Sequence, residues 1–231
     1  MPKVSIVITT WRRFKNIHTI LKAWVAEPEV AEVIVFDNSG RFIAPHPDGV
    51  KVINSQHNFG SQAGFMSGNF TSSEYVMVVN DDILPQPGFT ARMFEWLEKV
   101  RSPASRAHAL LSVHGRTLRG GTYKSALNPI HRGDLVEAPV RVDYIGQVYF
   151  GHRSNFTFDL GGACDPRLDD IDWNAKLRRQ KEGQNVTFWV VPNALYTRGE
   201  DCNDKYSISR LQGFWSIREQ YVKENSDVFG S

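Results

Sequence analysis

The sequence predicts an α/β protein in which a mostly parallel central sheet is flanked by helices. Short β-branched apolar runs alternate with segments of helical period, and each run ends in polar residues. This alternation is typical of a doubly wound sheet. The length of 231 residues and the apolar content of 41% suit one domain of ordinary size, which we expect to span residues 1–231.

Residues 1–84 carry four of the predicted strands and two of the predicted helices. A helix follows the first strand, because Phe14, Ile17, Leu21, Trp24 and Val25 recur on one helical face. The strands are expected at residues 4–8, 32–36, 50–53 and 75–79. The second helix, after the third strand, is rich in glycine.

That glycine-rich stretch spans residues 57–69, where Gly60, Gly64 and Gly68 recur every four residues. At helical spacing they form a face without side chains, which can approach a sheet or a ligand closely. Both interpretations stay open for Gly64 and Gly68. Gly60 and Ser61, at the expected helix start, are the better candidates for ligand contact. The stretch matches neither the dinucleotide fingerprint nor the Walker phosphate loop.

The second half is predicted in less detail. Residues 115–140 carry little periodicity and indicate loops, with room for a short hairpin. One or two strands are expected over residues 142–153. A terminal amphipathic helix is expected over residues 206–222, with Ile208, Leu211, Trp215 and Val222 facing inward. Before these segments we expect a helix over residues 89–100 and a strand over 109–113, and between the last two a helix opening at 169 and a strand over 187–192.

Two adjacent carboxylates, Asp81 and Asp82, come directly after the buried strand at residues 75–79. Ligands of open α/β sheets bind at the carboxyl ends of the strands. Adjacent carboxylates repel each other unless a positive group lies near them, and a hard divalent cation is a natural partner. The alternative is a polar turn that caps the next helix.

A second acidic cluster, Asp169, Asp170 and Asp172, opens the helix that ends in the basic residues 176–181. Acidic residues at the start and basic residues at the end suit the helix dipole, which is the structural explanation. Three carboxylates in four residues exceed what a cap requires. Trp173 beside them could stack on a sugar or belong to the core.

Composition narrows the possible partners and locations. The net charge of +2, without a polybasic tail, gives no indication of a nucleic-acid partner. No apolar run approaches the ~20 residues of a membrane span, and the N-terminus does not resemble a signal peptide. Cys164 and Cys202 are the only cysteines, and free thiols are the simple interpretation, with one disulfide left open. We therefore expect a cytoplasmic protein.

Taken in order, these motifs resemble the inverting, GT-A-fold (Rossmann-like) glycosyltransferases of the family 2 type. Order and spacing agree over residues 3–195. The matching pieces are residues 4–10, 35–39, 58–60, 79–82, 161–162, 165–168 and 169–172.

The resemblance divides the chain into a nucleotide-binding half at residues 1–84, an acceptor-binding half at 85–200 and a C-terminal helix at 201–231. It implies that Mn²⁺ or Mg²⁺, bound by Asp82 with Asp81 beside it, bridges the diphosphate of a nucleotide-sugar, most often UDP-linked. It implies that Asp170 is the catalytic base. The residues expected to bind the nucleotide are Thr9, Arg12 or Arg13, Asp37, Asn58, Gly60, Ser61 and Asp81, and those expected to contact a glycan acceptor are Asp169, Trp173 and Gly162.

The chain also departs from the family pattern. Family members commonly carry a metal-binding histidine after the last core strand, where this chain has none between Ala194 and Asp201. Asp201, Asp204 or water could complete a metal shell, or Arg198 could meet the diphosphate directly. The chain is short for a complete enzyme of this kind, which allows it to be one domain of a longer polypeptide.

Two other functions remain open at this point. A metal-dependent nucleotidyltransferase or phosphohydrolase would use Asp81 and Asp82 without needing Asp170. A non-catalytic nucleotide-sugar-binding domain would have the same sheet and would bind the donor without catalysing a reaction.

Overall fold

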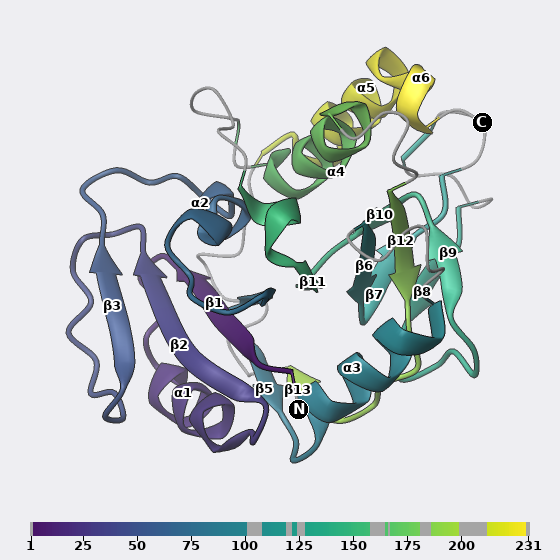
Figure 1. Ribbon diagram of the computed structural model, residues 1–231. Coiled ribbons are helices and arrows are strands. Elements are labelled where there is room, and N and C mark those ends of the chain that lie inside the picture. The colour runs from purple at the N-terminus through teal and green to yellow at the C-terminus, as the bar shows by residue number, and fades with distance from the viewer. Residues whose placement is uncertain are drawn as a thin grey trace.

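A mixed eight-stranded sheet forms the centre of the computed structural model, with helices on both faces (Figure 1). The structure describes residues 2–100, 108–118, 122–123, 128–157, 165, 167–180, 186–198 and 212–229. The strand order is β3-β2-β1-β4-β11-β6-β12-β9. Strands β1 to β4 pair in parallel, as does β6 with β12, whereas β11 runs antiparallel to both β4 and β6. The α/β prediction is therefore confirmed, in a sheet that is mixed at its middle.

The elements follow the predicted order. The strands of the large sheet are β1 (Val4–Thr10), β2 (Val30–Asp37), β3 (Val50–Asn54), β4 (Tyr75–Asn80), β6 (Ala109–Ser112), β9 (Val140–Val142), β11 (Val148–His152) and β12 (Thr187–Val190). The helices are α1 (Ile17–Ala26), α2 (Gln62–Phe65), α3 (Phe89–Val100), α4 (Asp169–Gln180), α5 (Phe214–Glu224) and α6 (Ser226–Phe229), with short 3-10 helices at Ser67–Asn69 and Arg153–Phe156.

Two small sheets flank the large one. Strand β7 (His114–Arg116) pairs antiparallel with β8 (Ile130–Arg132) and with β10 (Tyr144–Ile145). The stretch expected to be loops thus contains the β7–β8 hairpin. Strand β13 (Tyr196–Arg198) pairs antiparallel with β5 (Ile83–Pro85), which sets Arg198 opposite Ile83. This pairing brings Arg198 beside Asp82, one of the two carboxylates that follow β4.

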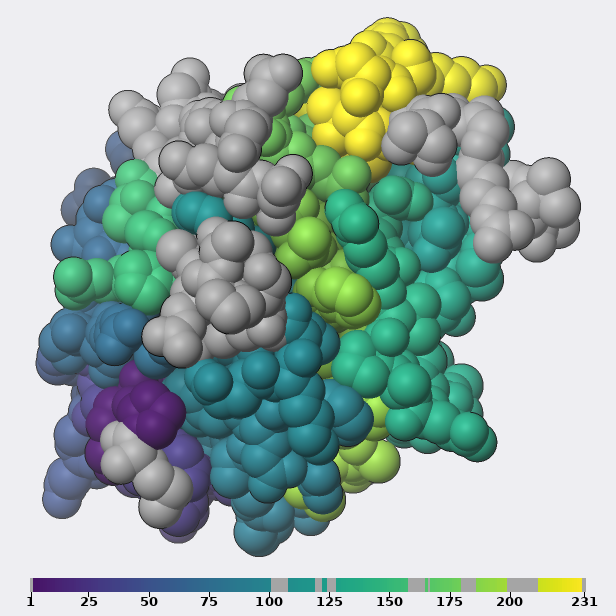
Figure 2. Space-filling view, turned by 45° about the vertical axis from the view of Figure 1, so that its right-hand side comes forward, coloured from purple at the N-terminus to yellow at the C-terminus, as the bar shows by residue number. Residues whose placement is uncertain are grey.

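The core lies on both faces of the large sheet, because successive strand side chains point to opposite faces. Ile6 and Ile8 of β1 pack with Trp24 of α1 and Phe89 of α3, while Val7 packs on the other side. A third cluster joins α4 to the C-terminal helices and to Tyr144 of β10. Figure 2 shows those helices, in yellow, at one end of the molecule.

The glycine-rich stretch forms α2 and a 3-10 turn instead of one continuous helix. A Cβ on Gly64 would stand 2.4 Å from Val78 Cγ1, and one on Gly68 would stand 2.6 Å from the Arg153 carbonyl oxygen. Both glycines therefore serve close packing, the first against the sheet. Gly60, with φ +59, lies at the turn into α2 and lines the cavity described below.

Two predicted helix faces are partly wrong. On α1 the side chain of Ile20 is buried while Val25 is 43% exposed. On α5 the inward residues are Phe214, Arg218 and Val222, and Trp215 is 43% exposed. Ile208, Leu211, Cys164 and Cys202 lie outside the described residues.

Candidate active site

A cavity of about 470 Å³ opens at the carboxyl ends of β1 and β4. Its wall contains Asp81 and Asp82 from the end of β4 together with Asp169 and Asp170 from the start of α4. The two acidic clusters, almost ninety positions apart in the chain, therefore face one space. A volume of this size lies within the usual range for small-molecule sites, about 300–1,000 Å³.

Arginines neutralise the first acidic pair. Asp81 receives the Arg13 guanidinium on Oδ1 and the Thr10 hydroxyl on Oδ2, the latter at 2.7 Å. Asp82 Oδ2 lies 3.3 Å from Arg198 Nη2 and 3.5 Å from Arg13 Nη2. Both carboxylates are buried, so the nearby guanidinium groups compensate for lost hydration.

Asp82 Oδ1 differs from its neighbours because it is buried and accepts no hydrogen bond from the described part of the chain. An unsatisfied anionic oxygen of this kind fits a divalent cation that takes its other ligands from substrate phosphates and water, as Mg²⁺ does. Asp82 therefore fits the implied metal through one oxygen. Among the described residues, no group of three His, Cys, Asp or Glu side chains is placed to hold a metal, and Asp201 and Asp204 lie outside them.

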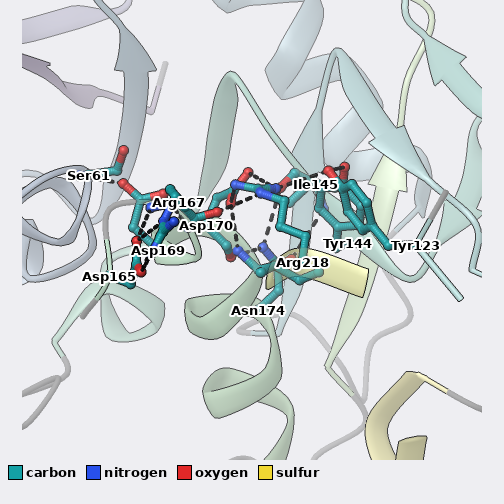
Figure 3. Close-up of polar contacts among 11 residues, drawn as sticks. Ser61, Tyr123, Tyr144, Ile145, Asp165, Arg167, Asp169, Asp170, Asn174 and Arg218 are labelled. Carbon is teal, nitrogen blue, oxygen red and sulfur yellow. Dashed lines mark hydrogen bonds and ion pairs between the residues drawn. The ribbon is translucent and has the colours of Figure 1, made fainter. Parts of the chain in front are cut away.

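The second acidic cluster is fixed at the start of α4 (Figure 3). The Ser61 amide donates a 2.9 Å hydrogen bond to Asp169 Oδ2, which ties α2 to α4, and the Asp170 amide donates to Asp169 Oδ1. Burial, together with the charge of Asp170, raises the pKa of Asp169 to about 6. Asp169 is thus a buried part of the cavity wall, and backbone amides hold its carboxylate in place.

Asp170 is engaged by a residue that sequence reasoning missed, Arg218 of α5 (Figure 3). The Arg218 guanidinium pairs with Asp170 Oδ1, which also accepts the Ile171 amide at 2.8 Å. Asp170 Oδ2 receives only a 3.3 Å contact from Arg218 Nη1. Oδ2 is therefore the oxygen left to accept a proton or a ligand hydroxyl. Burial alone would lower the pKa of Arg218, but the negative charge on Asp170 and the hydroxyls of Tyr123 and Tyr144 together outweigh burial and raise this pKa well above its ordinary value.

His114 of β7 also lines the cavity and was missed. Its Nδ1 and Asp170 Oδ2 lie 3.6 and 3.9 Å from where a Cβ of Gly146 would stand, so both groups border the same small space. Burial, and then the charges of Arg198 and Arg116, lower the pKa of His114 to about 4. The imidazole is therefore neutral near pH 7 and can accept or donate a hydrogen bond.

Of the residues predicted to bind nucleotide, Thr9, Asn58, Gly60, Ser61 and Asp81 line the cavity. Asn58 Oδ1 accepts the Gly60 amide at 2.9 Å, which shapes this loop.

The other two nucleotide predictions need correction. Asp37 is fully buried, and its carboxylate accepts the Ser39 amide and hydroxyl and the Arg41 amide, so its neighbour Asn38 reaches the cavity instead. Arg12 is exposed, with φ +62 and its guanidinium 4.8 Å from the Trp11 ring, and Arg13 takes the place in the wall.

The prediction that Trp173 contacts an acceptor is wrong. Its side chain is fully buried and stacks on Phe65 at a centroid distance of 4.4 Å and on Phe156 at 5.6 Å. The core alternative is the one that the structure shows. Gly162 lies outside the described residues.

Asp81 and Asp82 follow β4 and line the cavity at the sheet edge, which is where the sequence predicts them. Residues 5–105 match the family model of Glycosyl transferase family 2. This family-2 region runs from β1 through α3 and holds Asp81 and Asp82, whereas Asp170 and His114 lie beyond it. The match supports glycosyl transfer as the general activity. No curated protein matches the chain significantly, and no helix among the described residues is long and apolar enough to cross a membrane.

Proposed function

We propose that this chain transfers a sugar from a nucleotide-diphosphate sugar, UDP-linked, to a saccharide hydroxyl with inversion at the anomeric carbon. The observation that carries the proposal is the convergence of Asp82 and Asp170 on one cavity next to the family-2 region. A single displacement needs the leaving diphosphate and the base on opposite sides of the sugar. Asp82 would hold the metal that stabilises the diphosphate, and Asp170 would be the base.

On the donor side, Thr9, Asn58 and Ser61 form the wall against which the nucleotide would lie. Asp81, held by Thr10 and Arg13, would accept a ribose hydroxyl. Arg198 would contact the diphosphate, because it lies beside Asp82 with its side chain 44% exposed. Asp82 Oδ1 would hold Mg²⁺ or Mn²⁺, which, when bound, supplies charge stabilisation for the leaving diphosphate.

On the acceptor side, Asp170 Oδ2 would take the proton of the incoming hydroxyl. The hydroxyl oxygen forms a bond to the anomeric carbon as the bond from that carbon to the diphosphate oxygen breaks. The electron pair leaves with the diphosphate, and the proton moves to Asp170. Arg218 keeps Oδ1 occupied and so directs Oδ2 toward the reacting hydroxyl.

Incubation with Mn²⁺, a panel of nucleotide-sugars and a panel of glycan acceptors tests this function through the products. Sugar transfer releases a nucleoside diphosphate, whereas a phosphohydrolase or nucleotidyltransferase cleaves the pyrophosphate and releases a nucleoside monophosphate. A binding domain gives saturable donor binding and no product. Asp170→Asn should lower transfer by about 10²–10⁴-fold while nucleotide affinity stays within about threefold of wild type. Transfer at the wild-type rate in Asp170→Asn would refute the base assignment.

A further inference from the structure

One arginine in the cavity wall lacks a negative partner. Arg13, Arg198 and Arg218 each contact a carboxylate of the two acidic clusters. Arg116 of β7 lines the same cavity, and among the described residues no carboxylate lies within ion-pair distance of it. Among the described residues, the wall therefore carries one arginine without a neighbouring carboxylate to balance its charge.

Arg116 is also more than nine-tenths buried, with 8% of its surface exposed. Its Nη1 donates a 3.1 Å hydrogen bond to the backbone carbonyl of Tyr123, and its guanidinium lies 5.0 Å from the Tyr123 ring. Its Nε is buried and has no hydrogen-bond partner. A buried guanidinium left without an anion or a full set of acceptors is costly, so its position indicates a missing anionic ligand.

The surroundings of Arg116 belong to the acceptor side of the site. The Tyr123 hydroxyl accepts a 3.0 Å hydrogen bond from Arg218 Nη1, and Arg218 pairs with Asp170. His114, two residues before Arg116 and on the same face of β7, borders the space in front of Asp170 Oδ2. The donor phosphates are assigned to Asp82 and Arg198, whose carboxylate and guanidinium lie together.

An apolar surface for a sugar ring lies in the same wall. Trp215 of α5 lines the cavity, is 43% exposed and lies 6.0 Å from the Tyr123 ring. A half-exposed indole next to polar groups is a common platform for a carbohydrate ring. The indole of Trp215 and the guanidinium of Arg116 together fit a saccharide that carries a negatively charged group.

We infer that Arg116 binds an oxyanion of the acceptor, so that the acceptor is an acidic saccharide bearing a carboxylate or a phosphate. That the bound saccharide is the acceptor rests on the proposed function, whereas its negative charge is inferred from Arg116 itself. The guanidinium fork would present Nε and Nη2 to two oxygens of the group, with the neutral His114 available to a neighbouring hydroxyl.

Isothermal titration of the whole chain with single sugars tests the inference. The probes are glucuronate, glucose 6-phosphate and, as the neutral reference, methyl glucoside. We expect at least one anionic sugar to bind about tenfold or more tightly than methyl glucoside, since a charge-assisted pair is gained. The two anionic probes separate a carboxylate from a phosphate. Equal affinity for all three sugars would overturn the inference.

Matched variants locate the effect. Arg116→Gln should abolish the preference for the anionic sugar, and Arg116→Lys should keep part of it without the fork. Arg132→Gln is the control, because Arg132 lies on the neighbouring strand, is paired with Asp134 and is half exposed. A preference that survives in Arg116→Gln, or that disappears equally in Arg132→Gln, contradicts the assignment. If Arg116→Gln does not fold, the inference is tested by comparing the preference for anionic over neutral sugars between Arg116→Lys and the wild-type protein.

The two proposals fail separately. Release of nucleoside diphosphate from a nucleotide-sugar tests the transfer, and the preference of the protein for anionic over neutral sugars tests Arg116. Absence of turnover with an Arg116-dependent preference would leave an acidic-sugar site and refute the transferase. Turnover that uses neutral and acidic acceptors equally, in wild type and in Arg116→Gln, would refute the Arg116 site alone.

Discussion

The buried pair of Arg218 and Asp170 makes a quantitative prediction about folding. Arg218 is 4% exposed and Asp170 is 18% exposed at the side chain. Replacing Arg218 with Met removes the ion pair and two further hydrogen bonds, a 2.6 Å bond to the Arg167 carbonyl and a 3.0 Å bond to the Tyr123 hydroxyl. The hydrogen bonds contribute about 1 kcal/mol each. An unpaired carboxylate that water can still reach adds about 2 kcal/mol, within the range for a buried group that has lost its partner.

We therefore expect Arg218→Met to lower the free energy of unfolding by about 4 kcal/mol. Asp170→Asn should lower it by about 3 kcal/mol, because it leaves Arg218 unbalanced in a nearly closed site. Since each variant alone removes the pair, the double variant should lose about 5 kcal/mol instead of the sum, a coupling of about 2 kcal/mol.

Equilibrium urea unfolding, followed by circular dichroism, measures these values. Lys223→Met on the same helix is the control, because its pair with Glu219 is exposed and should contribute less than about 0.5 kcal/mol. Losses in the double variant that equal the sum of the single losses within about 0.5 kcal/mol would show that the two side chains do not interact in solution.

Three further predictions concern pH and packing. The pKa of Asp169 is raised from 3.8 to about 6 in the folded state, so the folded protein holds a proton that the unfolded chain releases, and stability should fall by up to about 3 kcal/mol as pH rises through this window. Asp169→Asn should remove that fall in urea titrations from pH 4 to 7. An unchanged pH dependence in this variant would refute the prediction. His114 acts oppositely, since its pKa is lowered from 6.5 to about 4: stability should be lost as pH falls through that range, and His114→Gln should unfold less steeply in acid than wild type. Gly64→Ala should lower the free energy of unfolding by about 1–3 kcal/mol, because the added Cβ would overlap with Val78 Cγ1. Adding Val78→Ala to this variant should restore part of the lost stability. Melting temperatures that show no rescue would contradict this contact.

The sequence predicts β1, β2 and β4 of the large sheet well because these strands are largely buried on both faces. The run from Tyr75 to Val79 is continuously apolar, and such a run has few alternatives to a central strand. The place of Asp81 and Asp82 at the sheet edge follows from the end of that run. The same holds for β1, whose apolar residues fill the cores on both sides of the sheet.

Helix faces and loop side chains were harder to predict, because periodicity gives an angle around a helix but not the position of the sheet. Trp215 fits the apolar period of the terminal helix, yet the packing of α5 turns Phe214 and Arg218 inward. Asp37 follows its strand as Asp81 does, but Ser39 and Arg41 curl back to satisfy it. Composition at a strand end therefore indicates where a site lies without telling which carboxylates remain available to a ligand.

The charges of the cavity show why Arg116 and Arg218 escaped prediction while the carboxylates did not. A cluster such as Asp169–Asp172 stands out within four residues, whereas the arginines that pair with the two acidic clusters come from α5, the loop after β1 and β13. The one local signal was Arg198, an arginine in the segment where the family commonly carries a histidine. Since every acid of the two clusters except Asp169 has a cation beside it, the ionised site is assembled from distant segments. In the wall, Arg116 Nε and Asp82 Oδ1 are each buried without a hydrogen-bond partner among the described residues, and only coordinates could reveal that property.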